Sequence, residues 1–313
     1  MRYFSLINNS GETLDITTHK IFFNEVSGLG YEEETSFRHV GEVWWLNTAS
    51  YRQQPIKGKI LFNSYDGVEP YTEFRKFVRF VQKVPLTLLY YPNGLGGKEY
   101  RKKIRVTKLE KSEINEYGVL EESIEFMPYT PWYEIYIVRN RAGEAFDGAW
   151  IWGDGDTHPD VAFPEAPEGA IPTRFGSEES RWVSLKVESD VESPSKLVIY
   201  GPLSNPIWTH YVDGKVVGTG EFTGDETISI EDDEALVIDN TDEIGQIKVY
   251  STYTDLDGQT QLGEPLRDLY PKRNFNTKCF ITLRAGLNRI ALSSVNTGSI
   301  RLMLEGHIYN ATV

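Results

Sequence analysis

Residues 70–104 read PYTEFRKFVRFVQKVPLTLLYYPNGLGGKEYRKKI, and this stretch predicts a helix followed by a buried strand. The apolar residues first recur at i, i+3, i+4 and i+7, which is the spacing of one stripe along an α-helix. The residues of this stripe are Phe74, Phe77, Val78 and Val81. Pro85 prevents the helix from continuing, and the apolar run 86–91 that follows indicates a buried strand. We therefore expect one helix, over residues 71–82, lying on a sheet.

The sheet beneath that helix has to come from the rest of the N-terminal region, which reads as short strands. Runs of Ile, Phe and Trp between turn residues indicate strands. Over residues 120–126 apolar and polar residues alternate, which places Leu120, Ile124 and Phe126 on one face of a half-buried strand. We expect an N-terminal β domain over residues 1–138, with Trp44 or Trp45 as the core aromatics beneath the helix.

The C-terminal region from residue 182 to residue 313 contains about nine short strand-like runs. Asp213-Gly214 and Asp257-Gly258 are strong signals for two-residue hairpin turns. Many short strands joined by turns are typical of a β-sandwich of jelly-roll type. Residues 139–181 differ, because prolines, glycines and small acids are frequent there and no period is sustained. We interpret them as a linker or extension between two all-β domains.

Composition and charge narrow the class of protein further. The chain has 313 residues and a single cysteine, Cys279, so it forms no internal disulfide and no thiolate metal cluster. Its first residues lack the basic and apolar regions of a signal peptide, and no apolar run is long enough to span a bilayer. We therefore expect a protein made in the cytoplasm that does not insert into membranes.

The net charge of −14 is unevenly distributed along the chain. Residues 1–135 carry a balance of −1 and residues 136–313 a balance of −13, yet 75–111 hold eleven basic side chains against two acidic ones. Such asymmetry is typical of a surface for nucleic acid or a protein partner, although a solvated face balanced by acidic neighbours explains it equally well. The basic residues that we take as candidates for contacts between subunits are Arg75, Arg79, Lys83, Arg101, Lys102 and Lys103.

The chain shows no catalytic constellation. The five histidines are scattered, no nucleophile elbow, P-loop or dinucleotide fingerprint is present, and Cys279 falls in a strand-like run that favours a buried structural thiol. We accordingly predict no enzyme activity, no cofactor and no assured metal site.

Two acidic loops are weak candidates for calcium. The first contains Asp154, Asp156 and Asp160, whose carboxylates are oxygen ligands at short spacing. The second, around Asp255 and Asp257, has its glycine at the wrong position for a calcium loop and is better explained as a hairpin turn.

Two tryptophans, Trp150 and Trp152, lie in the extension 139–181. Aromatic side chains of this size usually rest against another surface. We therefore take both as candidates for contacting a partner protein or a glycan.

The order of these elements resembles a known family. The N-terminal region is similar to the first domain of the distal tail (Dit) proteins of long-tailed bacteriophages, through the turn-rich NEVSGLGYEEE, the strand GEVWWLN, KGKILF, the helix YTEFRKFVRFVQ and the basic strand YRKKIRVTKLEKSE. NPIWTHY, EALVIDN and FITL resemble the galectin-like C-terminal domain of that family. The resemblance covers most of the chain except residues 139–182.

The resemblance implies a structural protein of the virion, located at the tail tip or baseplate. It implies an N-terminal domain that forms a homohexameric ring, a channel through which phage DNA passes without sequence-specific binding, and a galectin-like sandwich that projects outward. The partners it implies are the tail tube protein, the tail-associated lysin or fibre protein, and a receptor-binding protein.

Two other functions fit the residues. The first is a stand-alone carbohydrate-binding adhesin whose aromatic C-terminal sandwich reads host glycans. The second is a glycan hydrolase carrying an appended β module, for which the sequence offers carboxylates but no geometry.

Overall fold

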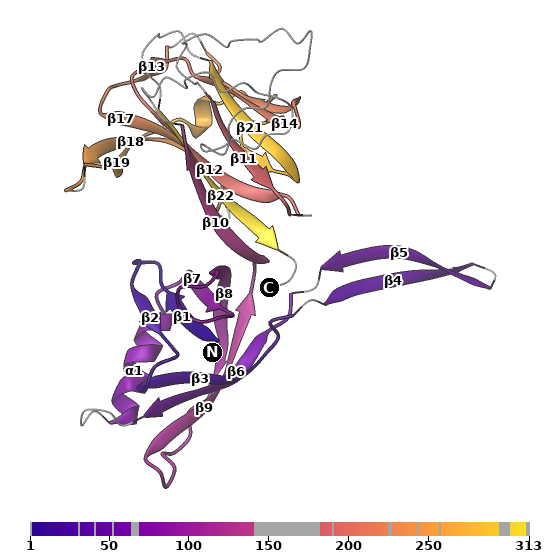
Figure 1. The fold of residues 1–313 in the computed structure, drawn as a ribbon, viewed down its shortest axis with the longest axis vertical. Helices are drawn as coiled ribbons and strands as arrows, with labels where there is room; N and C mark the ends of the chain where they lie inside the picture. The colour runs from indigo at the N-terminus through magenta and orange to yellow at the C-terminus, as the bar shows by residue number, and fades with distance from the viewer. Residues whose placement is uncertain are drawn as a thin grey trace, which may run out of the picture. The chain divides into compact units, whose positions relative to one another are not determined.

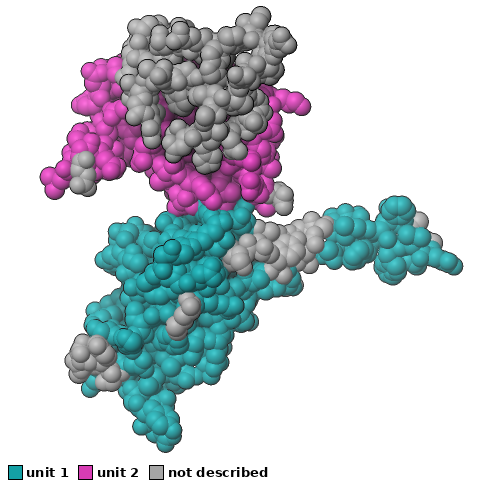
Figure 2. Space-filling view, in the orientation of Figure 1, with its two compact units in different colours: residues 1–134, 309–313 teal, residues 135–308 magenta. Residues whose placement is uncertain are grey.

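The protein divides into two compact units, which the computed structural model describes over most of their length. Unit 1 comprises residues 1–134 and 309–313, and unit 2 comprises residues 135–308 (Figure 2). The described residues are 2–30, 32–40, 42–51, 53–63, 69–140, 182–189, 191–224, 227–242, 244–256, 258–293 and 301–310.

Unit 1 is built around an antiparallel sheet with the strand order β2–β1–β7–β8–β9–β6–β3, and β10 also pairs with β8. Its strands are β1 (Tyr3–Ile7), β2 (Thr13–Asp15), β3 (Ile21–Ser27), β6 (Ile56–Asn63), β7 (Leu86–Tyr91), β8 (Tyr100–Leu109) and β9 (Val119–Pro128). The strand β10 (Trp132–Arg139) begins in unit 1 and continues into unit 2 from residue 135. The predicted alternation in β9 is confirmed, since Leu120, Ile124 and Phe126 are all buried in the core of this unit.

The helix α1 (Pro70–Val81) covers the core of unit 1, one residue earlier than predicted. It begins at Pro70, whose fixed φ angle and missing N–H suit the first turn. Phe74, Phe77 and Val81 are buried and Val78 packs partly against them, so the predicted apolar stripe is confirmed. The ring of Phe62 from β6 meets the helix edge-to-face, with centroids 5.4 Å from Phe74 and 5.6 Å from Phe77.

The expectation that Trp44 or Trp45 lies beneath this helix is wrong. Both belong to β5 (Val43–Tyr51), which forms a separate hairpin with β4 (Glu33–Val40), and Phe62 is the aromatic residue beneath α1. The two tryptophans are 66% and 62% exposed. Neither ring lies in the core because, among the described strands, β5 pairs only with β4 and not with a strand of the unit 1 sheet.

Unit 2 is a sandwich of two antiparallel sheets. One sheet has the strand order β22–β12–β17–β18–β19, and the other has the order β11–β21–β14–β15. The strands of the first are β12 (Ser193–Tyr200), β17 (Glu234–Asp239), β18 (Gln246–Thr254), β19 (Thr260–Asp268) and β22 (Arg301–Asn310). Those of the second are β11 (Trp182–Val187), β14 (Ile207–Val212), β15 (Lys215–Gly220) and β21 (Gly286–Ser293). Short pieces complete the unit: β13 (Leu203–Ser204), β16 (Ser229–Ile230), β20 (Thr282–Leu283) and the 3₁₀ turn η1 (Tyr270–Lys272).

The facing sides of the two sheets enclose one apolar core. Leu197 and Leu236 from the first sheet meet Val183, Trp208 and Ile290 from the second in a single cluster. Trp208 is fully buried and its indole N–H donates to the carbonyl oxygen of Cys279 at 2.7 Å. The prediction of an all-β chain with one α-helix is therefore confirmed for the described residues.

Candidate assembly site

The hairpin of β4 and β5 is the feature of unit 1 that its own core does not explain. Among the described strands, β4 and β5 pair only with each other, from Glu33 opposite Tyr51 to Val40 opposite Val43. In Figure 1 their two arrows lie side by side and next to no other strand. An isolated two-stranded ribbon is at best marginally stable in water unless it packs on something.

One face of this hairpin is apolar. Phe37 lies opposite Leu46 and His39 opposite Trp44, and all four side chains share a face because residues two apart in a strand point the same way. The His39 and Trp44 rings are 4.6 Å apart between centroids. Phe37 is 55% and Leu46 58% exposed.

The opposite face of the hairpin also carries exposed apolar side chains. Val43 and Trp45 point to that side and are both mostly exposed, with Arg38 opposite Trp45. Monomeric proteins rarely expose contiguous apolar surface, and such patches usually mark contacts with other molecules. A ribbon with exposed apolar side chains on both faces, which pairs with no other described strand, therefore has the character of an element that inserts into another protein surface.

The basic residues predicted for subunit contacts lie on two different elements. Arg75 and Arg79 are exposed on α1, which packs on β6 and β9, and Lys83 follows the helix. Arg101, Lys102 and Lys103 lie on β8, opposite β7.

Several of these charges already have partners within the unit. Lys83 forms an ion pair of 2.7 Å with Glu12, and Arg101 one of 2.5 Å with Glu99. Arg75 donates from Nε to the carbonyl oxygen of Tyr71 at 3.3 Å. Arg79 forms no ion pair with any described residue, so it presents an exposed positive charge on α1.

Lys102 lies in the interior of unit 1 and not on its surface. The side chain is 1% exposed, and its Nζ lies 4.9 Å above the ring of Trp132. Burial lowers the pKa of the Lys102 ammonium to about 8. The sequence carried a signal for this, because Ile104 and Val106 face inward and the alternation along β8 places Lys102 on the same side.

The remaining predicted residues divide between the described and undescribed parts of the chain. Asp154, Asp156, Asp160, Trp150 and Trp152 lie outside the described residues, as do Asp257 and most of the predicted linker 139–181. Within the described ranges no group of three or more His, Cys, Asp or Glu side chains is arranged to hold a metal ion.

Two smaller sequence interpretations concern described residues. The carboxylate of Asp255 accepts hydrogen bonds of 2.8 Å from the Gln259 N–H and from Gln261 Nε2, as expected of a hairpin turn between β18 and β19. Cys279 is buried, and its thiol donates to the carbonyl oxygen of Asn274 at 3.3 Å. Among the described helices, none has the length and apolar composition that crossing a bilayer requires.

Comparison with known proteins identifies the N-terminal part of the chain. Residues 3–129 match the family described as distal tail protein, N-terminal domain, which confirms the resemblance drawn from the sequence. No curated protein matches the chain.

Solved phage structures share the fold of the whole chain. Two structures of the phage P2 baseplate in its activated conformation, with calcium and with strontium, match at TM-scores of 0.66 and 0.65 and at 14% and 15% identity, each covering 100% of both chains. The SPP1 Dit protein, described as a paradigm of the hub adsorption apparatus in phages infecting Gram-positive bacteria, matches at a TM-score of 0.55 and 11% identity. That match covers 97% of this chain and 98% of the SPP1 protein. At these identities the likeness establishes the fold.

Proposed function

Because residues 3–129 match the N-terminal domain of the distal tail proteins, we propose that the chain is a structural component of a phage tail hub and that it assembles into a homohexameric ring. Each β4–β5 hairpin lies on the neighbouring subunit of that ring. The observation that carries the proposal is the exposure of apolar side chains on both faces of a ribbon that pairs with no other described strand.

A hairpin that inserts into a different surface of an identical chain makes a head-to-tail contact. Contacts of this kind generate a closed ring when the rotations from each subunit to the next add up to a full turn, and an open filament when they do not. The apolar core of such a contact supplies most of its binding free energy, since buried aromatic residues dominate interfaces. Six subunits is the number that the family resemblance implies.

The ring gives unit 1 and unit 2 different tasks. Unit 1 holds the subunits together around a channel through which phage DNA passes without sequence-specific contacts. Unit 2 attaches other tail proteins, for which the tail tube protein, the tail-associated lysin or fibre and a receptor-binding protein are the proposed partners. The role is structural, and no catalytic step is assigned to either unit.

Electron micrographs of the purified full-length protein test this proposal. We expect rings with sixfold averages for the wild-type chain. A variant in which residues 33–51 are replaced by a short Gly-Ser turn should show single particles of one chain, because the contact between subunits is removed while the sheet of unit 1 is kept. Single particles for the wild type, or rings for the shortened variant, would contradict the proposed assembly.

A further inference from the structure

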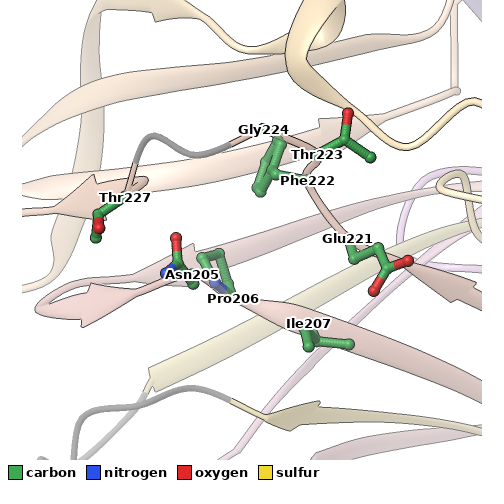
Figure 3. A pocket seen from close by; sticks show the side chains of 8 residues that line it. All are labelled: Asn205, Pro206, Ile207, Glu221, Phe222, Thr223, Gly224 and Thr227. Atoms are coloured by element: carbon green, nitrogen blue, oxygen red, sulfur yellow. The ribbon is translucent and has the colours of Figure 1, made fainter.

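A hollow of about 250 Å³ opens in unit 2 where the chain enters β14 and where it leaves β15 (Figure 3). Its lining includes Asn205 and Ile207 on one segment and Glu221, Phe222 and Thr223 on the other. Pockets for drug-sized ligands span roughly 300–1,000 Å³. The size of this hollow therefore suits one small ligand.

The first wall of the hollow is fixed by Asn205. Its backbone N–H donates to the carbonyl oxygen of Ile228 and its Oδ1 accepts from the Ile228 N–H, both at 2.8 Å. Asn205 adopts a φ of 46°, a conformation that asparagine tolerates better than most residues. Since Oδ1 is used in this way, the side chain offers its Nδ2 group as a donor.

The second wall is fixed by the loop that follows η1. The Thr223 N–H donates to the carbonyl oxygen of Lys272 and the Asn274 N–H to that of Glu221, each at 2.9 Å. Between these bonds Arg273 is held with its guanidinium carbon 3.5 Å from the Tyr270 ring centroid and 3.9 Å from that of Phe275. The wall that carries Glu221 is therefore formed before any ligand arrives.

One wall of the hollow offers a hydrogen-bond donor and the other offers an acceptor. Oε1 of Glu221 accepts from Asn274 Nδ2 at 2.7 Å, which leaves the second carboxylate oxygen as an acceptor. In Figure 3, Asn205 and Thr227 lie on one side of Phe222, with Glu221 and Thr223 on the other. The lining thus combines an amide donor, a carboxylate acceptor and the Thr227 hydroxyl with an aromatic ring and an aliphatic side chain, while the Thr223 hydroxyl donates to the carbonyl oxygen of Lys272 at 3.5 Å.

We propose that this hollow binds a single ring of a neutral saccharide. Neighbouring sugar hydroxyls each donate and accept, so they match the Asn205 amide, the Glu221 carboxylate and the Thr227 hydroxyl, and they donate to the Thr223 oxygen, whose own proton is directed to Lys272. The C–H face of the sugar ring rests on Phe222 and Ile207. The lining residues that the structure describes include no Lys, Arg or His, and the Glu221 carboxylate repels anions. Phosphate-bearing and carboxylate-bearing ligands are therefore excluded from the proposal.

Saccharide binding is a further activity that does not depend on ring assembly. The hollow is lined by residues 205–207, 221–224 and 227 of unit 2, far along the chain from the hairpin in unit 1. A chain that binds sugar but forms no ring, or that forms a ring but binds no sugar, separates the two proposals. Because the ligand is small and the hollow is open, we expect dissociation constants on the order of millimolar.

Ligand-observed NMR titration of the full-length chain tests the site. The probes are glucose, galactose, N-acetylglucosamine and the cationic sugar glucosamine. Asn205→Asp keeps the acceptor that Ile228 uses but removes the donor, and Glu221→Gln keeps an acceptor for Asn274 but removes the charge. The matched controls are Asn276→Asp and Glu188→Gln, which change exposed side chains outside the hollow in the same way.

We expect saturable binding of at least one of the three neutral sugars, weakened about tenfold by either change in the hollow and unaffected by the controls. Thr227→Val provides a third variant, since an exposed threonine is tolerant of substitution, and it should weaken binding as well. Absence of saturable binding for all three neutral sugars would overturn the proposal. Binding that all three variants leave unchanged would overturn it too, as would binding of glucosamine alone.

Discussion

The helix α1 and the hairpin β4–β5 both carry large apolar side chains, but the helix buries them and the hairpin exposes them. Phe77 on the helix is fully buried against Phe62, whereas Phe37 on the hairpin is more than half exposed. The helix completes a core within its own chain, and the hairpin presents apolar surface on two faces with no core of its own. The difference is the basis for the proposal that the hairpin contacts another molecule, whereas the helix belongs to the core of unit 1.

A matched pair of substitutions gives the largest contrast between the two regions. Phe77→Ala should lower the free energy of unfolding by about 3–5 kcal/mol, because it removes a fully buried ring and leaves a cavity. Phe37→Ala should change it by no more than about 0.5 kcal/mol, because the ring is exposed in the single chain. Urea unfolding of unassembled protein measures both values. Similar losses for the two variants would mean that the hairpin belongs to the core of its own unit.

The second prediction concerns Lys102, whose side chain is buried in unit 1. The folded-state pKa of about 8 lies below the ordinary value of 10.5, so the unfolded state binds more protons between these values. Stability should therefore rise as the pH increases from about 8 toward 10, by an amount on the order of 1–2 kcal/mol. Lys102→Met should remove this rise, because no charge is then buried.

Unfolding at pH 7.5 and pH 9.5 measures the effect before tyrosine ionisation becomes important. Burial raises the pKa values of Tyr3, Tyr91 and Tyr133 to about 12, so their opposing contribution appears above pH 10. Lys57→Met is the control, since Lys57 lies at the surface beside Glu125. A wild-type stability that falls or stays level between the two pH values would show that burial does not lower the pKa of Lys102.

The smallest effect is expected from the basic face of the helix. Reversing the charge at both Arg75 and Arg79 should leave the unfolding free energy of the single chain within about 0.5 kcal/mol, because both side chains are exposed. If α1 faces a neighbouring subunit, the same variant should weaken assembly at low salt and less so at high salt.

The matched control is Lys215→Glu with Lys278→Glu, which makes the same change of charge on exposed residues of unit 2. Sedimentation at two salt concentrations compares the two double variants. Equal assembly of both variants at low salt would remove α1 from the subunit contact and leave the hairpin as the sole described candidate.

The contrast between helix and hairpin also explains how far the sequence predicts the structure. Periodicity is sufficient to find α1, the buried strand after Pro85 and the alternation of Leu120, Ile124 and Phe126, because each reflects burial within one chain. It is not sufficient to find the environment of Trp44 and Trp45. Their apolar character is evident in the sequence, but whether the covering surface lies in the same chain or in another one is not.

The positions of charged residues in the sequence likewise do not show which of them are paired in the folded chain. The eleven basic residues between 75 and 111 form one block in the sequence, yet they lie on α1, on β8 and in the segments beside them, and several are paired with carboxylates. The alternation of β8 would have placed Lys102 inside, whereas the ion pairs with Glu12 and Glu99 depend on tertiary contacts that no local pattern encodes. The hollow beside Asn205 depends in the same way on segments distant in the sequence.

The molar mass of the protein in solution tests the proposed use of the hairpin most directly. Light scattering after size-exclusion chromatography should give a mass of six chains of 35.7 kDa for the wild type. The double variant Trp44→Ser with Trp45→Ser should give the mass of one chain, with the unfolding transition of unit 1 preserved, because both faces of the hairpin lose their aromatic residues. A wild-type mass of one chain at every concentration, or a double variant that stays hexameric, would contradict a ring held together by this hairpin.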